Sequence, residues 1–145
     1  MKNEGTSLKE LKNQAHKKYK SFGLIYCKAI NDHVVFNNHG WKHLAFDGKG
    51  HRRNSDNIFM RLKLVLHAPA VIEHGSIVKD EIVEVLINEK QLKVRNIELA
   101  HPIDGTNHHV TVIIRRIEES TLHYYSVRRT KNKIKRMILK QKNPQ

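Results

Sequence analysis

The stretch from residue 37 to residue 61 concentrates the side chains of this sequence that can do chemistry. Its letters are NNHGWKHLAFDGKGHRRNSDNIFMR, and they surround the only tryptophan with imidazole and guanidinium groups. Imidazoles titrate near neutral pH, and guanidinium groups hold phosphates with a planar fork of donors. A hydrophobic core cannot hold that many unpaired cations. The stretch therefore predicts a site that binds a phosphodiester and moves a proton on it. The residues concerned are His39, His43, His51, Arg52, Arg53 and Arg61.

His43 is the candidate for proton transfer. It lies in the segment GWKHL, where Trp41 and Leu44 are expected to enter the core and hold the imidazole rigidly. An ordinary histidine pKa near 6.5 suits a general base acting on a ribose 2′-hydroxyl. The alternative is a histidine that only closes the turn after Gly40.

Arg53 and Arg61 are the candidates for phosphate contact. Arg53 follows a Gly-Lys-Gly loop and precedes the N-terminus of a predicted helix, where backbone N–H groups also attract anions. Arg61 lies one to two turns further into that helix. The alternative is an ordinary solvated run of charges. The further side chains that we expect to contact RNA are Lys42, Lys49, His51, Arg52, Tyr124, Arg129 and Lys131.

A late strand, LHYYSVR over residues 122–128, carries polar side chains with a period of two. That period puts Tyr124, Ser126 and Arg128 on one face. These polar side chains are unsuited to a hydrophobic core and could line a phosphate site. The alternative is an exposed sheet face. His108 and His109 begin the preceding strand, and at most one of them can face the site. We favour His109 as a possible second imidazole because it shares the parity of Arg115.

The charge of the chain favours nucleic acid as its partner. Lys and Arg total 27 against 14 Asp and Glu, which gives a formal net charge of +13. Such an excess raises the local concentration of phosphate and speeds association. We expect RNA, and a merely basic or ribosome-bound protein is the alternative. A DNA-binding protein is disfavoured because no helix-turn-helix spacing is evident.

Composition also limits the cofactors and the compartment. Carboxylates are sparse in the basic stretch, whereas a two-metal nuclease needs several, so no metal and no other cofactor is expected. Zinc held by three imidazoles is a minor alternative. No apolar stretch approaches the roughly 20 residues of a membrane span, and the N-terminus lacks an apolar signal segment. The chain is therefore expected in the cytoplasm, with no membrane partner.

The elements that would position these residues predict an α+β fold in one domain over residues 1–145. Apolar periodicity and caps indicate two helices, the second divided by Pro69, and alternation indicates strands. A hairpin and both helices would pack on a four-stranded antiparallel sheet, followed by a basic tail from about residue 129. The expected helices are 7–20 and 56–74, and the expected strands are 24–29, 33–37, 81–88, 92–100, 109–117 and 122–128.

This order of elements resembles the barnase–EndoU–colicin–RelE superfamily of metal-independent ribonucleases. The runs VVFNNHGWKHL, GKGHRR and HYYSVRR are similar to those of its phage or mobile-element toxin domains. The resemblance implies cleavage of RNA, such as tRNA or mRNA, to a 2′,3′-cyclic phosphate. By position, His43 would be base or acid, and Arg53 and Arg61 would hold the scissile phosphate. Ser126 and Arg128 would complete the pocket, with His109 as a possible second imidazole.

Two functions therefore compete at this point. The first is a toxin-type endoribonuclease, which would need an acidic antitoxin or immunity protein to cover its basic cleft. The second is a non-catalytic RNA- or ribosome-binding module, for which the basic helix and tail suffice through counterion release. They differ in whether His43, Arg53, Ser126 and Arg128 converge in space.

Overall fold

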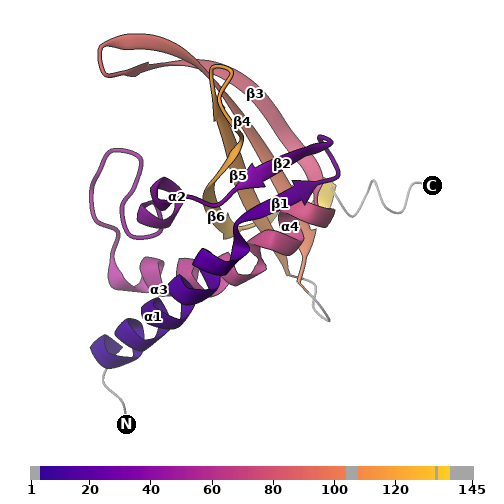
Figure 1. Cartoon of the computed structure of the whole chain (residues 1–145). Helices are drawn as coiled ribbons and strands as arrows, with labels where there is room; N and C mark the ends of the chain where they lie inside the picture. Colours follow the sequence, from indigo (N-terminus) through magenta and orange to yellow (C-terminus); the bar gives the residue numbers. More distant parts are fainter. Residues whose placement is uncertain (1–3, 104–107, 133, 138–145) are drawn as a thin grey trace, which may run out of the picture.

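The computed structural model describes residues 4–103, 108–132 and 134–137, and it has an α+β architecture. A curled sheet of six strands runs in the order β1-β2-β6-β5-β4-β3, with helices packed against one of its faces (Figure 1). The helical elements are α1 (Glu4–Phe22), α2 (Asn38–Lys42), α3 (Ser55–Leu64), the 3-10 turn η1 (Val65–His67) and α4 (Ala68–His74). The strands are β1 (Leu24–Cys27), β2 (Asp32–Val35), β3 (Ser76–Ile87), β4 (Lys90–Pro102), β5 (His109–Ile117) and β6 (His123–Arg129).

The predicted second helix is divided near Pro69, as expected. The α3 helix ends at Leu64, and after η1 the α4 helix begins with Pro69 in its first turn, where a missing N–H is tolerated. The N-cap of α3 is Asn54 rather than Ser55, because the Asn54 side chain accepts a hydrogen bond from the backbone N–H of Asn57 at 2.8 Å. Gly75 ends α4, and its α-carbon lies too close to the Val71 carbonyl for a side chain.

The four predicted late strands form the expected antiparallel meander, β3 to β6. The prediction of a four-stranded sheet is nevertheless wrong, because the β1–β2 hairpin joins the same sheet. Val35 of β2 pairs in parallel with His123 of β6, and the Val35 N–H donates to the Leu122 carbonyl at 3.0 Å. The sheet is therefore mixed and has six strands. Among the described residues, β2 meets β6 only at this end, and no other described strand lies beside the rest of that β6 edge.

The core lies between the sheet and the helices. On the sheet it is made by alternating apolar residues that face each other across the β4–β5 register, such as Ile97 with Ile114 and Leu99 with Val112. The helices contribute apolar side chains from the opposite side, and Cys27 is buried there as well. The largest fully buried side chains are Tyr124, Leu62, Ile72, Ile97, Leu99, Ile114, Leu122, Val34, Val65, Val71, Val94 and Val110.

A β-bulge in β6 changes which side chains share a face. Ile113 pairs with Ser126 and Ile114 pairs with Tyr124, so Tyr125 is an extra residue on its strand. Tyr124 therefore turns to the core with Ile114, where it is fully buried. The prediction that Tyr124 shares a face with Ser126 and Arg128 is wrong for this reason.

The basic tail is described only in part. Residues 134–137 are helical. Residues 133 and 138–145 lie outside the described residues.

Candidate functional site

The short helix α2 sets the position of His43. Its N-cap is Asn37, whose side chain accepts from the Gly40 N–H at 3.1 Å, while the Tyr19 hydroxyl donates to the Asn37 carbonyl at 2.6 Å. Gly40 lies directly against β6, since a β-carbon there would be 2.5 Å from the Tyr124 carbonyl oxygen. His43 follows as the C-cap of this helix. A glycine at the contact thus lets α2 bring His43 to the sheet.

Arg53 binds His43 twice. Its Nε donates to the His43 carbonyl at 3.1 Å, and its Nη2 lies 3.3 Å from the imidazole Nδ1. A guanidinium only donates hydrogen bonds, so Nδ1 accepts and the neutral ring carries its proton on Nε2. The other contact of the ring is Tyr125, whose centroid lies 4.3 Å from that of His43. The bulge residue thus supports the imidazole.

Arg61 reaches from α3 to the open edge of β6. Its Nη1 donates to the Ser126 hydroxyl at 3.1 Å and to the Val127 carbonyl at 2.7 Å. Its Nε donates to the Asn57 side chain at 2.7 Å, which holds the guanidinium from its own helix. The arginine therefore satisfies part of the strand edge that β2 leaves uncovered.

Arg115 completes the group from β5. Its guanidinium carbon lies 3.6 Å from the centroid of the Tyr125 ring, a cation–π contact, and its Nε donates to the Asn96 side chain at 2.9 Å. We call His43, Arg53, Arg61, Arg115 and Tyr125 the His43 cluster.

The electrostatics of the cluster disfavour positive charge. Burial, followed by the charges of Arg53, Arg61 and Arg115, lowers the pKa of His43 to about 4, so the imidazole is neutral at pH 7. Burial and the charge of Arg53 also lower the pKa of Arg61 to about 10. Among the described residues, no carboxylate forms an ion pair with any of these three arginines. The site is a half-buried concentration of cations around a neutral base.

Ser126 and Arg128 lie beside the cluster, and their roles at a phosphate stay predictions. Ser126 is buried and accepts from Arg61. Arg128 is close enough to lower the pKa of Arg61, but its Nη2 donates to the Glu98 carboxylate at 2.5 Å. Arg128 is therefore already neutralised by Glu98, unlike the arginines of the cluster.

His109 and Tyr124 do not join the cluster. His109 is buried at the opposite end of β5 from Arg115, about 20 Å away at the rise of a β-strand. Tyr124 lies in the core, with its ring stacked on Phe36 at 5.1 Å. Its ring is thus not on the surface where an RNA contact was predicted.

The remaining predicted RNA contacts lie on the surface at two places. Lys42, Lys49, His51 and Arg52 are exposed on α2 and on the loop that follows it. Asp47 shapes this loop by accepting from the backbone N–H groups of residues 49 and 51, at 2.9 and 3.0 Å. Arg129 and Lys131 are exposed beyond the end of β6.

Sequence reasoning missed Arg115 and Tyr125 as site residues. Strict alternation assigned Tyr125 to the face opposite Ser126, and only the bulge brings it to His43. His39 also approaches Tyr125, with ring centroids 6.0 Å apart. No local signal in the sequence marks this bulge, because it depends on the register of β6 against β5.

The described part of the chain offers neither a cluster of metal ligands nor a membrane-spanning helix. No group of His, Cys, Asp and Glu side chains there is arranged to hold a metal ion. None of its helices is long and apolar enough to cross a membrane.

The fold and the cluster together define an α+β domain with a basic, carboxylate-poor site at an open sheet edge. A family model, the large polyvalent protein-associated domain 3, matches residues 6–124. The chain belongs to this family. Comparisons with curated proteins and with solved structures gave no match.

Proposed function

We propose that this protein is a metal-independent endoribonuclease of the toxin type, and that the His43 cluster is its active site. One observation carries the proposal: Arg53, Arg61 and Arg115 surround a neutral imidazole, and no described carboxylate pairs with them. Half-buried cations without paired carboxylates are well suited to an anionic ligand. A phosphodiester supplies that charge.

The reaction would be an intramolecular transfer. The ribose 2′-oxygen attacks the adjacent phosphorus, the bond from phosphorus to the 5′-oxygen breaks, and a 2′,3′-cyclic phosphate remains. A proton leaves the 2′-hydroxyl, and the departing 5′-oxygen takes one up. Arg53 and Arg61 would stabilise the charge on the pentavalent phosphorane. His43 would move the proton at one of these two atoms.

Substrate binding would prepare His43 for this role. In the free protein its Nδ1 is occupied by Arg53, and its pKa is about 4. A bound phosphate attracts Arg53 and opposes the cationic field, and both effects raise the pKa of the imidazole towards neutrality. The freed Nδ1 could then accept a proton.

A second candidate is a non-catalytic RNA-binding protein. The observation that favours it is the same low pKa, because a group with a pKa of about 4 is a weak base at neutral pH. The cluster would then bind phosphate without cleaving RNA, and the exposed cations around it would add affinity.

The test is cleavage of labelled tRNA and mRNA in EDTA by three proteins: the wild type, His43→Gln, and the control His33→Gln, whose ring is exposed on β2. We expect the wild type and the control to cleave equally. His43→Gln should be slower by about 100-fold or more and should still bind RNA in a fluorescence anisotropy assay. Binding without cleavage by the wild type would favour the second candidate. Full activity of His43→Gln would rule out the assigned role.

The partners follow from the same proposal. RNA is the substrate, the cytoplasm is the compartment, and an acidic inhibitor protein would cover the cluster in the host cell. The net charge of +13 favours both RNA and such an inhibitor. The family description further suggests that the domain acts in association with large polyvalent proteins.

A further inference from the structure

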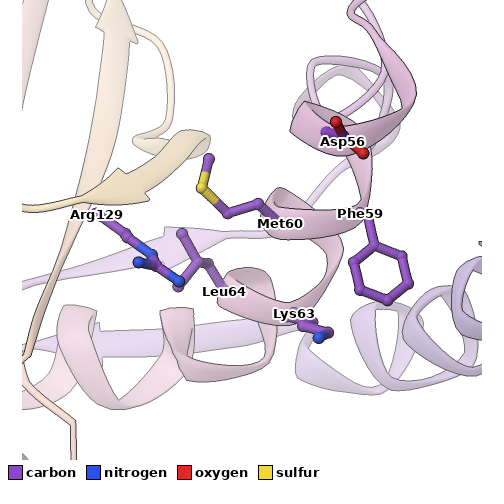
Figure 2. Close-up of a pocket in the computed structure, with 6 residues that line it drawn as sticks. All are labelled: Asp56, Phe59, Met60, Lys63, Leu64 and Arg129. Carbon is purple, nitrogen blue, oxygen red and sulfur yellow. The ribbon is translucent and has the colours of Figure 1, made fainter.

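A hollow lies between α3 and the end of β6. It has a volume of about 290 Å³. Figure 2 shows its lining, in which five side chains from α3 meet one from β6. The lining residues are Asp56, Phe59, Met60, Lys63, Leu64 and Arg129.

The lining combines three chemistries. Phe59, Met60 and Leu64 are apolar, Lys63 and Arg129 are cationic, and Asp56 is a carboxylate. The Lys63 ammonium lies 4.3 Å from the centroid of the Phe59 ring, which holds one cation beside the apolar surface. A nucleotide has the matching parts: flat apolar faces, a polar edge and an anionic phosphate.

We propose that the α3–β6 hollow is a nucleotide subsite that accepts a base with an exocyclic amino group. The base packs on Phe59 and Met60, its phosphate lies near Lys63 and Arg129, and its amino group donates to Asp56. Base stacking on an aromatic ring and a basic surface for the backbone are the two elements of single-strand binding.

The subsite lies next to the His43 cluster along α3 and β6, and its assignment to the same RNA strand rests on the proposed function. Met60 precedes Arg61 on α3, and Arg129 lies two residues beyond Val127, whose carbonyl Arg61 binds. Two residues of a strand span about 7 Å, a distance that one nucleotide of an extended strand can bridge. The subsite would hold a nucleotide next to the phosphate at Arg53 and Arg61.

Asp56 supplies the selectivity. A carboxylate only accepts hydrogen bonds, so it favours the 4-amino group of cytosine over the 4-carbonyl oxygen of uracil. It also repels a bare anion, which distinguishes this hollow from a general phosphate site. CMP and UMP differ only at position 4 of the base and in whether N3 carries a hydrogen, so they are a matched pair of ligands.

Methyl NMR of the full chain tests the proposal. The protein has three methionines, Met1, Met60 and Met137. Of the two that the structure describes, Met60 lines the hollow and Met137 does not. With ¹³C-labelled methionine methyl groups, titration with CMP should shift the Met60 resonance to saturation and leave the other two unchanged. UMP should need about a tenfold higher concentration. Inorganic phosphate should leave the Met60 resonance in place.

Variants separate the parts of the subsite. Asp56→Asn should remove the preference for CMP, and Phe59→Ala should remove the CMP-dependent shift. Arg129→Ala should weaken binding of both nucleotides, whereas Lys20→Ala on α1 should leave it unchanged. Equal shifts with phosphate and CMP, equal affinity for CMP and UMP, or no shift of Met60 would overturn the inference.

The outcome is independent of cleavage, because a mononucleotide has no bond for the proposed reaction to break. A Met60 shift without RNA cleavage would support the subsite and count against the proposed enzyme. Cleavage without a Met60 shift would do the reverse.

Discussion

Replacing Arg53 with glutamine should raise the pKa of His43. Burial is the largest cause of the low pKa of about 4, and the Arg53 charge is the second. The variant removes that charge, and a glutamine amide can still donate a hydrogen bond towards Nδ1. The imidazole should therefore become easier to protonate while its position is kept.

The size of the change follows from the contact. The Arg53 nitrogen lies 3.3 Å from Nδ1. A unit charge at about 4 Å contributes about 1 kcal/mol in water and about 4 kcal/mol at an effective dielectric constant of about 20. His43 is only half-buried, so solvent screening favours the lower end. At about 1.4 kcal/mol per pH unit, we expect the pKa of His43 to rise by about one pH unit and to stay below 6.5.

A histidine NMR titration measures this directly. The ring Cε1–H resonances of the eleven histidines are followed from acid to neutral pH, and the His43 signal is identified by its loss in His43→Gln. The wild-type midpoint should lie near pH 4, with the Arg53→Gln midpoint about one unit higher. A wild-type midpoint near 6.5, or identical midpoints in the two proteins, would refute the reasoning.

Three further predictions concern stability, each measured by urea denaturation. Arg61→Ala should lower the free energy of unfolding by about 2–3 kcal/mol, because it removes hydrogen bonds from a half-buried guanidinium to β6. The control Arg95→Ala breaks an exposed ion pair and should lower it by under about 1 kcal/mol. Gly40→Ala should lower the free energy of unfolding by about 3 kcal/mol or more, since its methyl group would overlap Tyr124. In the control Gly48→Ala the methyl group meets only ordinary contacts, so equal losses in the two variants would contradict this prediction. The pKa of His43 is lowered on folding, so the unfolded chain binds more protons between pH 6.5 and 4. Stability should therefore fall with acid across that window, and the fall should be larger in the wild type than in His43→Gln by about 1.5 kcal/mol after allowance for exposure, since His123 also loses stability in acid in both proteins.

The local elements could be predicted from the sequence because their signals are local. The period of α1, the division at Pro69 and the alternation of β3 to β6 each arise within a few residues. The same is true of the closeness of His43 to Arg53, which one loop connects.

The parts that could not be predicted depend on contacts between distant segments. The parallel contact of Val35 with His123 adds the hairpin to the sheet through a single residue pair. The bulge at Tyr125 depends on the register with β5, and it reverses the faces of the two tyrosines. That reversal brings Tyr125 to Arg115, where the cation–π contact forms. Strict alternation along a strand assumes that no residue is inserted, so it cannot predict a bulge.

The chemical form of the RNA ends produced in EDTA tests the central claim most directly. If the His43 cluster cleaves RNA as proposed, the wild type should leave 2′,3′-cyclic phosphate ends, and His43→Gln should form them more slowly by about 100-fold or more. Intact RNA with the wild type, or products that carry 5′-phosphate ends, would contradict the account.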